Sequence, residues 1–138
     1  MDIKNLRVLI AEDDLDDGEF ICESFSNHAA VAKVDWVKNG KELLSFLNSN
    51  DKKKPDIILT DINMPLVNGI EALEEIYKNE QLASIPVFVY SSSVNPVYEK
   101  RCKELGALGY LIKPFNLAAF NEIPNQIIEI LNQRVLHK

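Results

Sequence analysis

Five short runs rich in valine, isoleucine and leucine recur along the chain, and their spacing constrains the fold more than any other feature of the sequence. Several runs are continuously apolar, which is typical of parallel strands that helices cover on both faces. Segments in which apolar residues repeat with the period of a helix separate the runs, so the order of elements is strand then helix, five times over. The predicted strands are residues 7–11, 32–37, 56–60, 86–90 and 107–112.

The segments between and after these runs predict five helices. Apolar stripes mark three of them: Ile21, Cys22, Phe25 and Ala29; Leu43, Leu44 and Leu47; and Ile70, Leu73, Ile76 and Tyr77. The other two predicted helices are residues 96–105 and 117–135, and Pro124 requires the last one either to begin near this proline or to bend there. Strands and helices that alternate with short connections predict a parallel sheet with helices on both sides, a three-layer α/β domain.

Length and composition restrict the number of domains and the class of partner. The 138 residues fit one domain, and 46% hydrophobic residues are enough to form a core. A net charge of -6 repels phosphate backbones, so we expect no direct binding to nucleic acid or to anionic membranes. The sequence shows no signal peptide and no membrane-spanning stretch, and Cys22 and Cys102 suggest no disulfide framework. We therefore expect a cytoplasmic protein.

Polar and charged side chains stand at the ends of four predicted strands. In an open parallel α/β sheet, ligands bind beyond the carboxyl ends of the strands, so these side chains converge on one rim. Each alone has a structural explanation, because acids and serines cap helices and a lysine at a strand end is usually solvated. Their occurrence together favours a functional site. The residues are Glu12, Asp13 and Asp14 after the first run, Asp61 and Asn63 after the third, Ser91, Ser92 and Ser93 after the fourth, and Lys113 after the fifth.

The residue types in this set indicate phosphoryl chemistry assisted by a metal ion. Neighbouring carboxylates repel each other by about 4 kcal/mol per close pair, so the set needs a positive group. Lys113 supplies one, and a set of oxygen ligands with no histidine or cysteine favours a hard ion such as Mg²⁺ over zinc. A carboxylate beside Mg²⁺ and an ammonium group is suited to attack phosphorus and form an acyl phosphate.

These motifs, taken in order, resemble the receiver domain of two-component response regulators over essentially the whole chain. The matching motifs are Glu12-Asp13, Asp61-Ile62-Asn63-Met64-Pro65 with Gly69, Ser91, and residues 106–115, which read Gly-Ala-Leu-Gly-Tyr-Leu-Ile-Lys-Pro-Phe. The resemblance implies a flavodoxin-like, doubly wound fold with a five-stranded parallel sheet of order 2-1-3-4-5. The chain is similar to stand-alone receivers, including the chemotaxis regulator and receivers paired with phytochrome kinases. We therefore expect residues 1–138 to be a single receiver domain without an output domain.

The resemblance also implies a role for each matching residue. Asp61 would be the phosphoacceptor, taking its phosphoryl group from a sensor histidine kinase or a histidine phosphotransfer protein. The expected ligands of a Mg²⁺ or Mn²⁺ ion are the side chains of Glu12, Asp13 and Asp61 and the backbone carbonyl of Asn63. The residues expected to contact the phosphoryl group are Ser91, Ser92 and Lys113. A cis peptide bond before Pro114 would aim the lysine.

Within the family, phosphorylation changes a surface by coupling a hydroxyl group to an aromatic residue. Here Ser91 would move toward the phosphate and Tyr110 would then swing inward. The surface that changes, formed by helix 96–105, strand 107–112 and helix 117–135, would bind an unknown downstream protein or form a homodimer of an otherwise monomeric protein. Asn63 and Ser93 stand where the family tunes dephosphorylation. Tyr90 departs from the family pattern, because an aliphatic residue is expected there.

Other functions remain open on the sequence alone. Asp61-Ile62-Asn63 resembles the Asp-x-Asp motif of metal-dependent phosphohydrolases that form an aspartyl phosphate, although their nucleophile is expected after the first strand. A pseudo-receiver that only binds partners is disfavoured because every phosphorylation position is filled, and a flavin site lacks a phosphate-binding loop after the first strand. A role as a phosphate sink or shuttle in a relay stays open. We expect a signalling protein with intrinsic self-phosphorylation and autodephosphorylation, not a metabolic enzyme.

Overall fold

The five apolar runs of the sequence form the five strands of one parallel sheet. In the computed structural model, which describes residues 3–136, the strands are β1 (Leu6–Ala11), β2 (Val31–Val37), β3 (Ile57–Asp61), β4 (Val87–Ser91) and β5 (Gly109–Ile112). Their order in the sheet is β2-β1-β3-β4-β5, and each neighbouring pair is parallel. The predicted doubly wound, flavodoxin-like topology is confirmed.

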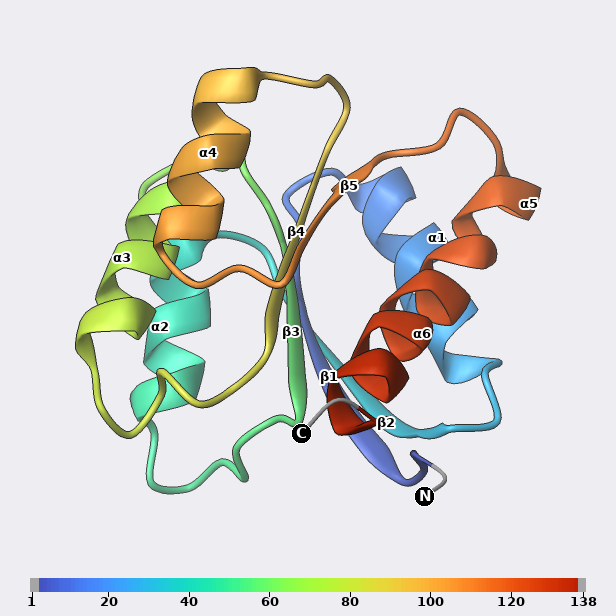
Figure 1. Cartoon of the computed structure of the whole chain (residues 1–138), viewed down its shortest axis with the longest axis horizontal. Helices are drawn as coiled ribbons and strands as arrows, with labels where there is room; N and C mark the ends of the chain where they lie inside the picture. Colours follow the sequence, from blue (N-terminus) through green and yellow to red (C-terminus); the bar gives the residue numbers. More distant parts are fainter. Residues whose placement is uncertain (1–2, 137–138) are drawn as a thin grey trace.

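The helices lie in two layers, one on each face of the sheet (Figure 1). One layer contains α2 (Gly40–Asn48), α3 (Gly69–Lys78) and α4 (Pro96–Glu104), and the other contains α1 (Leu15–Ser26), α5 (Leu117–Phe120) and α6 (Glu122–Leu136). The chain runs outward from β1 to β2 and then returns past β1 to β3, so the direction of winding reverses between β1 and β3. Ligands of such sheets bind at this switch point. Among residues 3–136, no helix combines the length and the apolarity that a membrane span requires.

The three central strands, β1, β3 and β4, are buried on both faces because alternate side chains enter two separate cores. In β1, Leu9 and Ala11 enter the core under α2, α3 and α4, whereas Val8 and Ile10 enter the core under α1, α5 and α6. This double burial explains why the strands read as continuous apolar runs. Most members of the predicted helical stripes are at least partly buried, but Tyr77 is exposed and Ala29 lies beyond the end of α1.

The last predicted helix is two helices, because Pro124 prevents one continuous helix. The short helix α5 ends at Phe120, and α6 begins at Glu122 after a turn at Asn121. Pro124 lies in the first turn of α6, where a missing N–H donor is not needed. In an uninterrupted helix its ring would clash with the carbonyl of Phe120, four residues earlier. Of the two predicted alternatives, a helix that begins near the proline is therefore confirmed.

Candidate functional site

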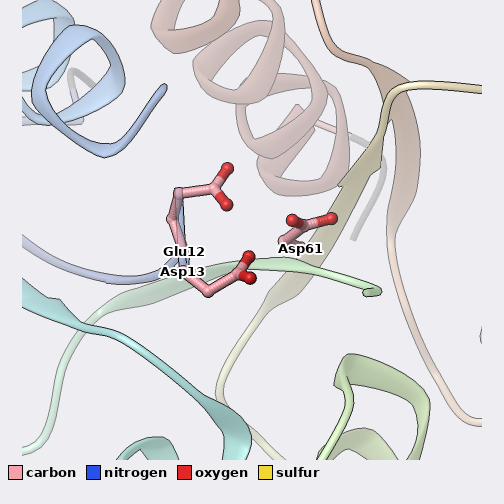
Figure 2. A group of neighbouring side chains, drawn as sticks. All are labelled: Glu12, Asp13 and Asp61. Atoms are coloured by element: carbon pink, nitrogen blue, oxygen red, sulfur yellow. The ribbon is translucent and has the colours of Figure 1, made fainter. Parts of the chain in front are cut away.

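The predicted acidic residues gather at the switch point, where the carboxyl ends of β1 and β3 lie side by side. Glu12 follows β1 directly, and Asp61 is the last residue of β3. Parallel pairing of Ala11 with Thr60 brings these ends together. Figure 2 shows Glu12, Asp13 and Asp61 grouped at this rim, and one carboxylate oxygen from each lies within 4.8 Å of the others. The structure thus forms a cluster of three carboxylates from two strands.

Lys113 lies against this cluster and contacts three carboxylates. Its backbone N–H donates to the carbonyl of Ser91 at 2.8 Å, which fixes the residue beyond the end of β5. Its Nζ atom lies 2.7 Å from Oε1 of Glu12, 2.9 Å from Oδ2 of Asp61 and 3.3 Å from Oδ2 of Asp17. Burial lowers the pKa of Lys113, but hydrogen bonds to Glu12 and Asp61 outweigh burial and raise this pKa above its ordinary value. The lysine is therefore charged at neutral pH.

Glu12 is a fully buried carboxylate with hydrogen-bond donors on both oxygens. Oε1 accepts from the Tyr90 hydroxyl at 2.6 Å as well as from Lys113, and Oε2 accepts from the backbone N–H of Asp14 at 3.2 Å. Burial raises the pKa of Glu12, and the charge of Asp61 raises it further. Hydrogen bonds from Lys113 and Tyr90 act in the opposite direction but leave the pKa above its ordinary value. Several donors thus hold the carboxylate in place, yet burial still favours its neutral form.

Asp61 is buried and held in one orientation by the loop that follows β3. Its Oδ1 atom accepts from the backbone N–H of Ile62 at 2.7 Å, and its Oδ2 atom faces Lys113. The loop returns close to the strand, because the N–H of Gly69 donates to the carbonyl of Ile62 at 2.8 Å. A Cβ atom on Gly69 would lie 2.1 Å from the carbonyl oxygen of Asp61, so this close approach requires glycine.

The remaining predicted site residues lie around the cluster. Ser91 is buried at the end of β4, whereas Ser92, Ser93 and Asn63 are exposed on the loops that follow β4 and β3. Tyr110 on β5 packs against the core under α2, α3 and α4, and its hydroxyl donates to the carbonyl of Ser93 at 3.3 Å. The contacts of these residues with a phosphoryl group, and the backbone carbonyl of Asn63 as a metal ligand, stay predictions.

The peptide bond between Lys113 and Pro114 is trans, so the prediction of a cis bond is wrong. Trans is the more stable form of most bonds that precede proline. In this arrangement Lys113 already reaches both Glu12 and Asp61. The position of the lysine is explained by its contacts.

Three residues that contact the cluster were not assigned to it from the sequence. Tyr90 differs from the family pattern in being larger than the expected aliphatic residue, and its partner Glu12 lies 78 residues away in the chain. Trp36 on β2 donates from Nε1 to the backbone carbonyl of Glu12 at 2.9 Å, and its ring packs so closely on Gly18 that any larger residue there would clash. Asp17, the third carboxylate at Lys113, is the one with a local signal, because it lies in the first turn of α1 directly after the acidic run.

The cluster fits a hard divalent cation. Glu12, Asp13 and Asp61 carry three negative charges, and the single charge of Lys113 leaves two of them uncompensated. Partial desolvation and the charge of Glu12 raise the pKa of Asp13, which is a further sign of unmet negative charge. Carboxylate oxygens with access to water are the ligands that Mg²⁺ and Mn²⁺ prefer.

Comparisons with known proteins agree with this chemistry. Residues 8–124 match the family described as response regulator receiver domain. The phosphorylated cyanobacterial phytochrome response regulator RcpA is 30% identical to this chain, with a TM-score of 0.84 over 91% of this chain and 92% of that chain. The Mn²⁺-bound form of response regulator Rcp1 is 28% identical, with a TM-score of 0.79 over 88% of this chain and 91% of that chain.

Curated relatives share the same region. The probable methanogenesis regulatory protein FilR2 of Methanothrix harundinacea is 28% identical over 89% of this chain and 79% of its own length. A protein-glutamate methylesterase/protein-glutamine glutaminase of Clostridium acetobutylicum is 28% identical over 92% of this chain, but the chain spans only 36% of that relative. Receiver domains are signalling modules that take a phosphoryl group from a histidine kinase onto an aspartate, with a divalent metal ion in an acidic pocket. Because the family match, the fold and the acidic site agree, this chain belongs to the response regulator receiver domain family of two-component systems.

Proposed function

We propose that Asp61 is the phosphoacceptor of this receiver and that its donor is the phosphohistidine of a sensor kinase or of a phosphotransfer protein. The observation that supports this assignment is the placement of Asp61 at the end of β3, where its carboxylate faces the other acids and Lys113. In the transfer, a carboxylate oxygen of Asp61 bonds to phosphorus while the P–N bond of the donor breaks. The electron pair of that bond stays on the imidazole nitrogen, which takes a proton from water.

The neighbouring residues prepare this oxygen and the incoming charge. Glu12, Asp13, Asp61 and the backbone carbonyl of Asn63 hold the divalent ion, which neutralises charge on the phosphoryl oxygens when it is bound. Lys113 compensates for the charge of the phosphoryl group. The residues that donate hydroxyl hydrogen bonds to its oxygens are Ser91 and Ser92. The exposed side chains of Asn63 and Ser93 flank the site and set the rate at which water removes the phosphoryl group.

We propose that the face formed by α4, β5 and the last helical segment, α5 with α6, is the surface that phosphorylation changes. Tyr110 connects this face to the site, because its hydroxyl contacts the loop that follows Ser91. Apolar side chains are exposed here: Val97 on α4 is 73% exposed, Ile112 at the end of β5 is 45% exposed, and Phe115 in the loop between β5 and α5 is 99% exposed. A downstream protein binds this surface in our proposal. The alternative partner is a second copy of the chain. Sedimentation of the phosphorylated protein distinguishes the two, because only the second alternative forms a homodimer. Both free cysteines fit a cytoplasmic, reducing location.

Phosphorylation by a small donor tests the assignment of Asp61. We expect wild-type protein incubated with Mg²⁺ and acetyl phosphate to gain one labile phosphoryl group by intact mass, and Asp61→Asn to gain none. Asp56→Asn is the matched control, because Asp56 precedes β3 at the end opposite Asp61 and accepts from the backbone N–H of Arg7 at 2.8 Å. Labelling of Asp61→Asn at the wild-type level would refute the assignment.

The same experiment separates the alternative functions. A phosphohydrolase would turn over many unrelated phosphate esters in steady state, whereas a receiver carries at most one phosphoryl group per chain, on Asp61. A pseudo-receiver that only binds partners would show no labelling of the wild type. A phosphate shuttle would pass the label from Asp61 to a histidine phosphotransfer protein added afterwards.

A further inference from the structure

Tyr90 is a buried polar group that the proposed function does not use. It precedes Ser91 on β4, its side chain is fully buried, and its parallel neighbour on β3 is Asp61. Its hydroxyl donates to Oε1 of Glu12 at 2.6 Å. An aliphatic residue would fill the same core position without this hydrogen bond, so the hydroxyl group needs a separate explanation.

The same oxygen of Glu12 has a second donor, and this shared contact connects Tyr90 to the lysine. Nζ of Lys113 lies 2.7 Å from Oε1 of Glu12 and 5.0 Å from the centre of the Tyr90 ring. The ammonium group therefore lies close to both the aromatic ring and the carboxylates, and it shares Oε1 of Glu12 with the phenol. Lys113 also contacts Asp61 at 2.9 Å, so it is the group that must rearrange when Asp61 changes.

We propose that Tyr90 is a positioning residue for phosphoryl transfer: its hydroxyl keeps Oε1 of Glu12 paired while Lys113 leaves that oxygen for the incoming phosphoryl group. The inference rests on the proposed function, because it assumes transfer to Asp61. Glu12 is fully buried, and a buried carboxylate oxygen without a donor is unfavourable. With Tyr90 in place, the lysine moves without leaving Oε1 unpaired. Without the Tyr90 hydroxyl, Oε1 of Glu12 has no donor whenever Lys113 moves away, which is unfavourable for a buried carboxylate.

The transfer from acetyl phosphate gives a balanced reaction in which to measure this effect. One oxygen of Asp61 bonds to phosphorus, the bond from phosphorus to the acetyl oxygen breaks, and its electron pair leaves with acetate, so no proton is transferred. Tyr90→Phe keeps the ring against Lys113 and removes only the hydroxyl group. We expect the maximal rate at saturating Mg²⁺ to fall about tenfold, because the unpaired oxygen now arises on the path to the transition state.

A second measurement separates this role from a defect in the fold or in the metal site. Trp36, the only tryptophan, donates to the backbone carbonyl of Glu12, so its fluorescence reports Mg²⁺ binding without any phosphoryl transfer. We expect the Mg²⁺ concentration at half-saturation to stay within about twofold of wild type, because Lys113 still pairs with Glu12 in the resting site. Ser24→Ala is the control, since Ser24 is a buried hydroxyl that donates to Asn121 at 2.7 Å, and it should leave both quantities unchanged.

A double-mutant cycle with Glu12→Gln decides whether Tyr90 acts through Glu12. The neutral amide does not hold the lysine as an ion pair, so Tyr90→Phe should lower the rate far less in this background than in the wild type. Equal effects in both backgrounds would overturn the proposal, as would a normal rate in Tyr90→Phe. A rate that recovers fully at high Mg²⁺ would also overturn it, because Tyr90 would then serve metal binding. Failure of the wild type to be labelled would refute the proposed function itself, which distinguishes the two.

Discussion

Lys113→Met tests how much the acidic cluster depends on the lysine that contacts it. The side chain of Lys113 is 11% exposed and faces Glu12 and Asp61, which are both buried. Removal of one partner from a buried ion pair costs about 3–5 kcal/mol. Tyr90 still donates to Glu12 and Ile62 still donates to Asp61 in the variant, so both carboxylates keep a donor. We therefore expect a loss at the lower end, about 3 kcal/mol of unfolding free energy near neutral pH without Mg²⁺.

The loss should depend on pH with a defined sign. The pKa of Lys113 in the folded protein is raised above its ordinary value of 10.5, so its stabilising effect is present below that pH and is lost as pH rises through the folded-state pKa. At the acidic end, the effect decreases as Glu12, whose pKa is raised by burial, takes up a proton and no longer needs a cation. The difference between wild type and Lys113→Met should thus be largest near neutral pH and smaller at acidic pH, where Glu12 is protonated.

Urea unfolding followed by circular dichroism, in the presence of a chelator, measures this difference. Lys33→Met is the control, because Lys33 is 54% exposed and lies 3.9 Å from Asp35 in a surface ion pair. Such a pair contributes about 0–1 kcal/mol. A loss for Lys113→Met no larger than that of Lys33→Met, or a loss that does not change with pH, would refute the view that the cluster depends on this lysine.

Three other predictions concern the metal site and the loop after β3. Added Mg²⁺ should stabilise the fold by about 1.4 kcal/mol at ten times its dissociation constant. In the metal-free protein the pKa of Glu12 is raised above 4.5 and that of Asp13 above 3.8. The free energy of unfolding should therefore fall as the pH rises above these values. Saturating Mg²⁺ should remove this fall, which thermal unfolding at several pH values would measure. Leu66, in the loop after β3, has φ at 67° and is 75% exposed. Asparagine adopts this left-handed conformation at lower cost than leucine. Leu66→Asn should therefore raise the free energy of unfolding by about 0.5–1 kcal/mol, which a higher urea midpoint would show. An unchanged or lower midpoint would contradict that reading of the backbone.

The strands and the acidic rim could be predicted from the sequence because both depend on local pattern. Continuous apolar runs report burial on two faces, and polar residues after such runs must meet at one rim of a parallel sheet. Pro124 was also informative, because the restriction that it places on a helix is local. The sequence alone does not show whether the helix bends at Pro124 or begins near it, because this depends on the turn at Asn121.

The contacts that surround the cluster depend on packing between distant segments, and the sequence contains no local signal for them. Tyr90 reads as a core residue of β4, yet its hydroxyl ends against Glu12 because β3 and β1 bring that carboxylate within reach. Trp36 reads as a residue of a strand at the sheet edge, yet it fits over Gly18 and reaches the backbone of Glu12. The geometry at Pro114 also depends on where the chain leaves β5, which the motif alone does not give.

The hydrogen bonds at the ends of β4 and β5 oppose a shift of these strands. We therefore expect phosphorylation to change side chains and the loop after β4. The backbone N–H of Lys113 donates to the carbonyl of Ser91, so a sliding movement of β5 along β4 would displace the lysine that faces Asp61. The loop after Ser91 is not restricted in this way, since Ser92 and Ser93 are exposed. The carbonyl of Ser93 accepts from the Tyr110 hydroxyl at 3.3 Å, a long hydrogen bond whose loss costs little. A movement of the Ser91 side chain and of the loop after it toward a phosphoryl group is therefore expected to release Tyr110 while the paired sheet stays in place.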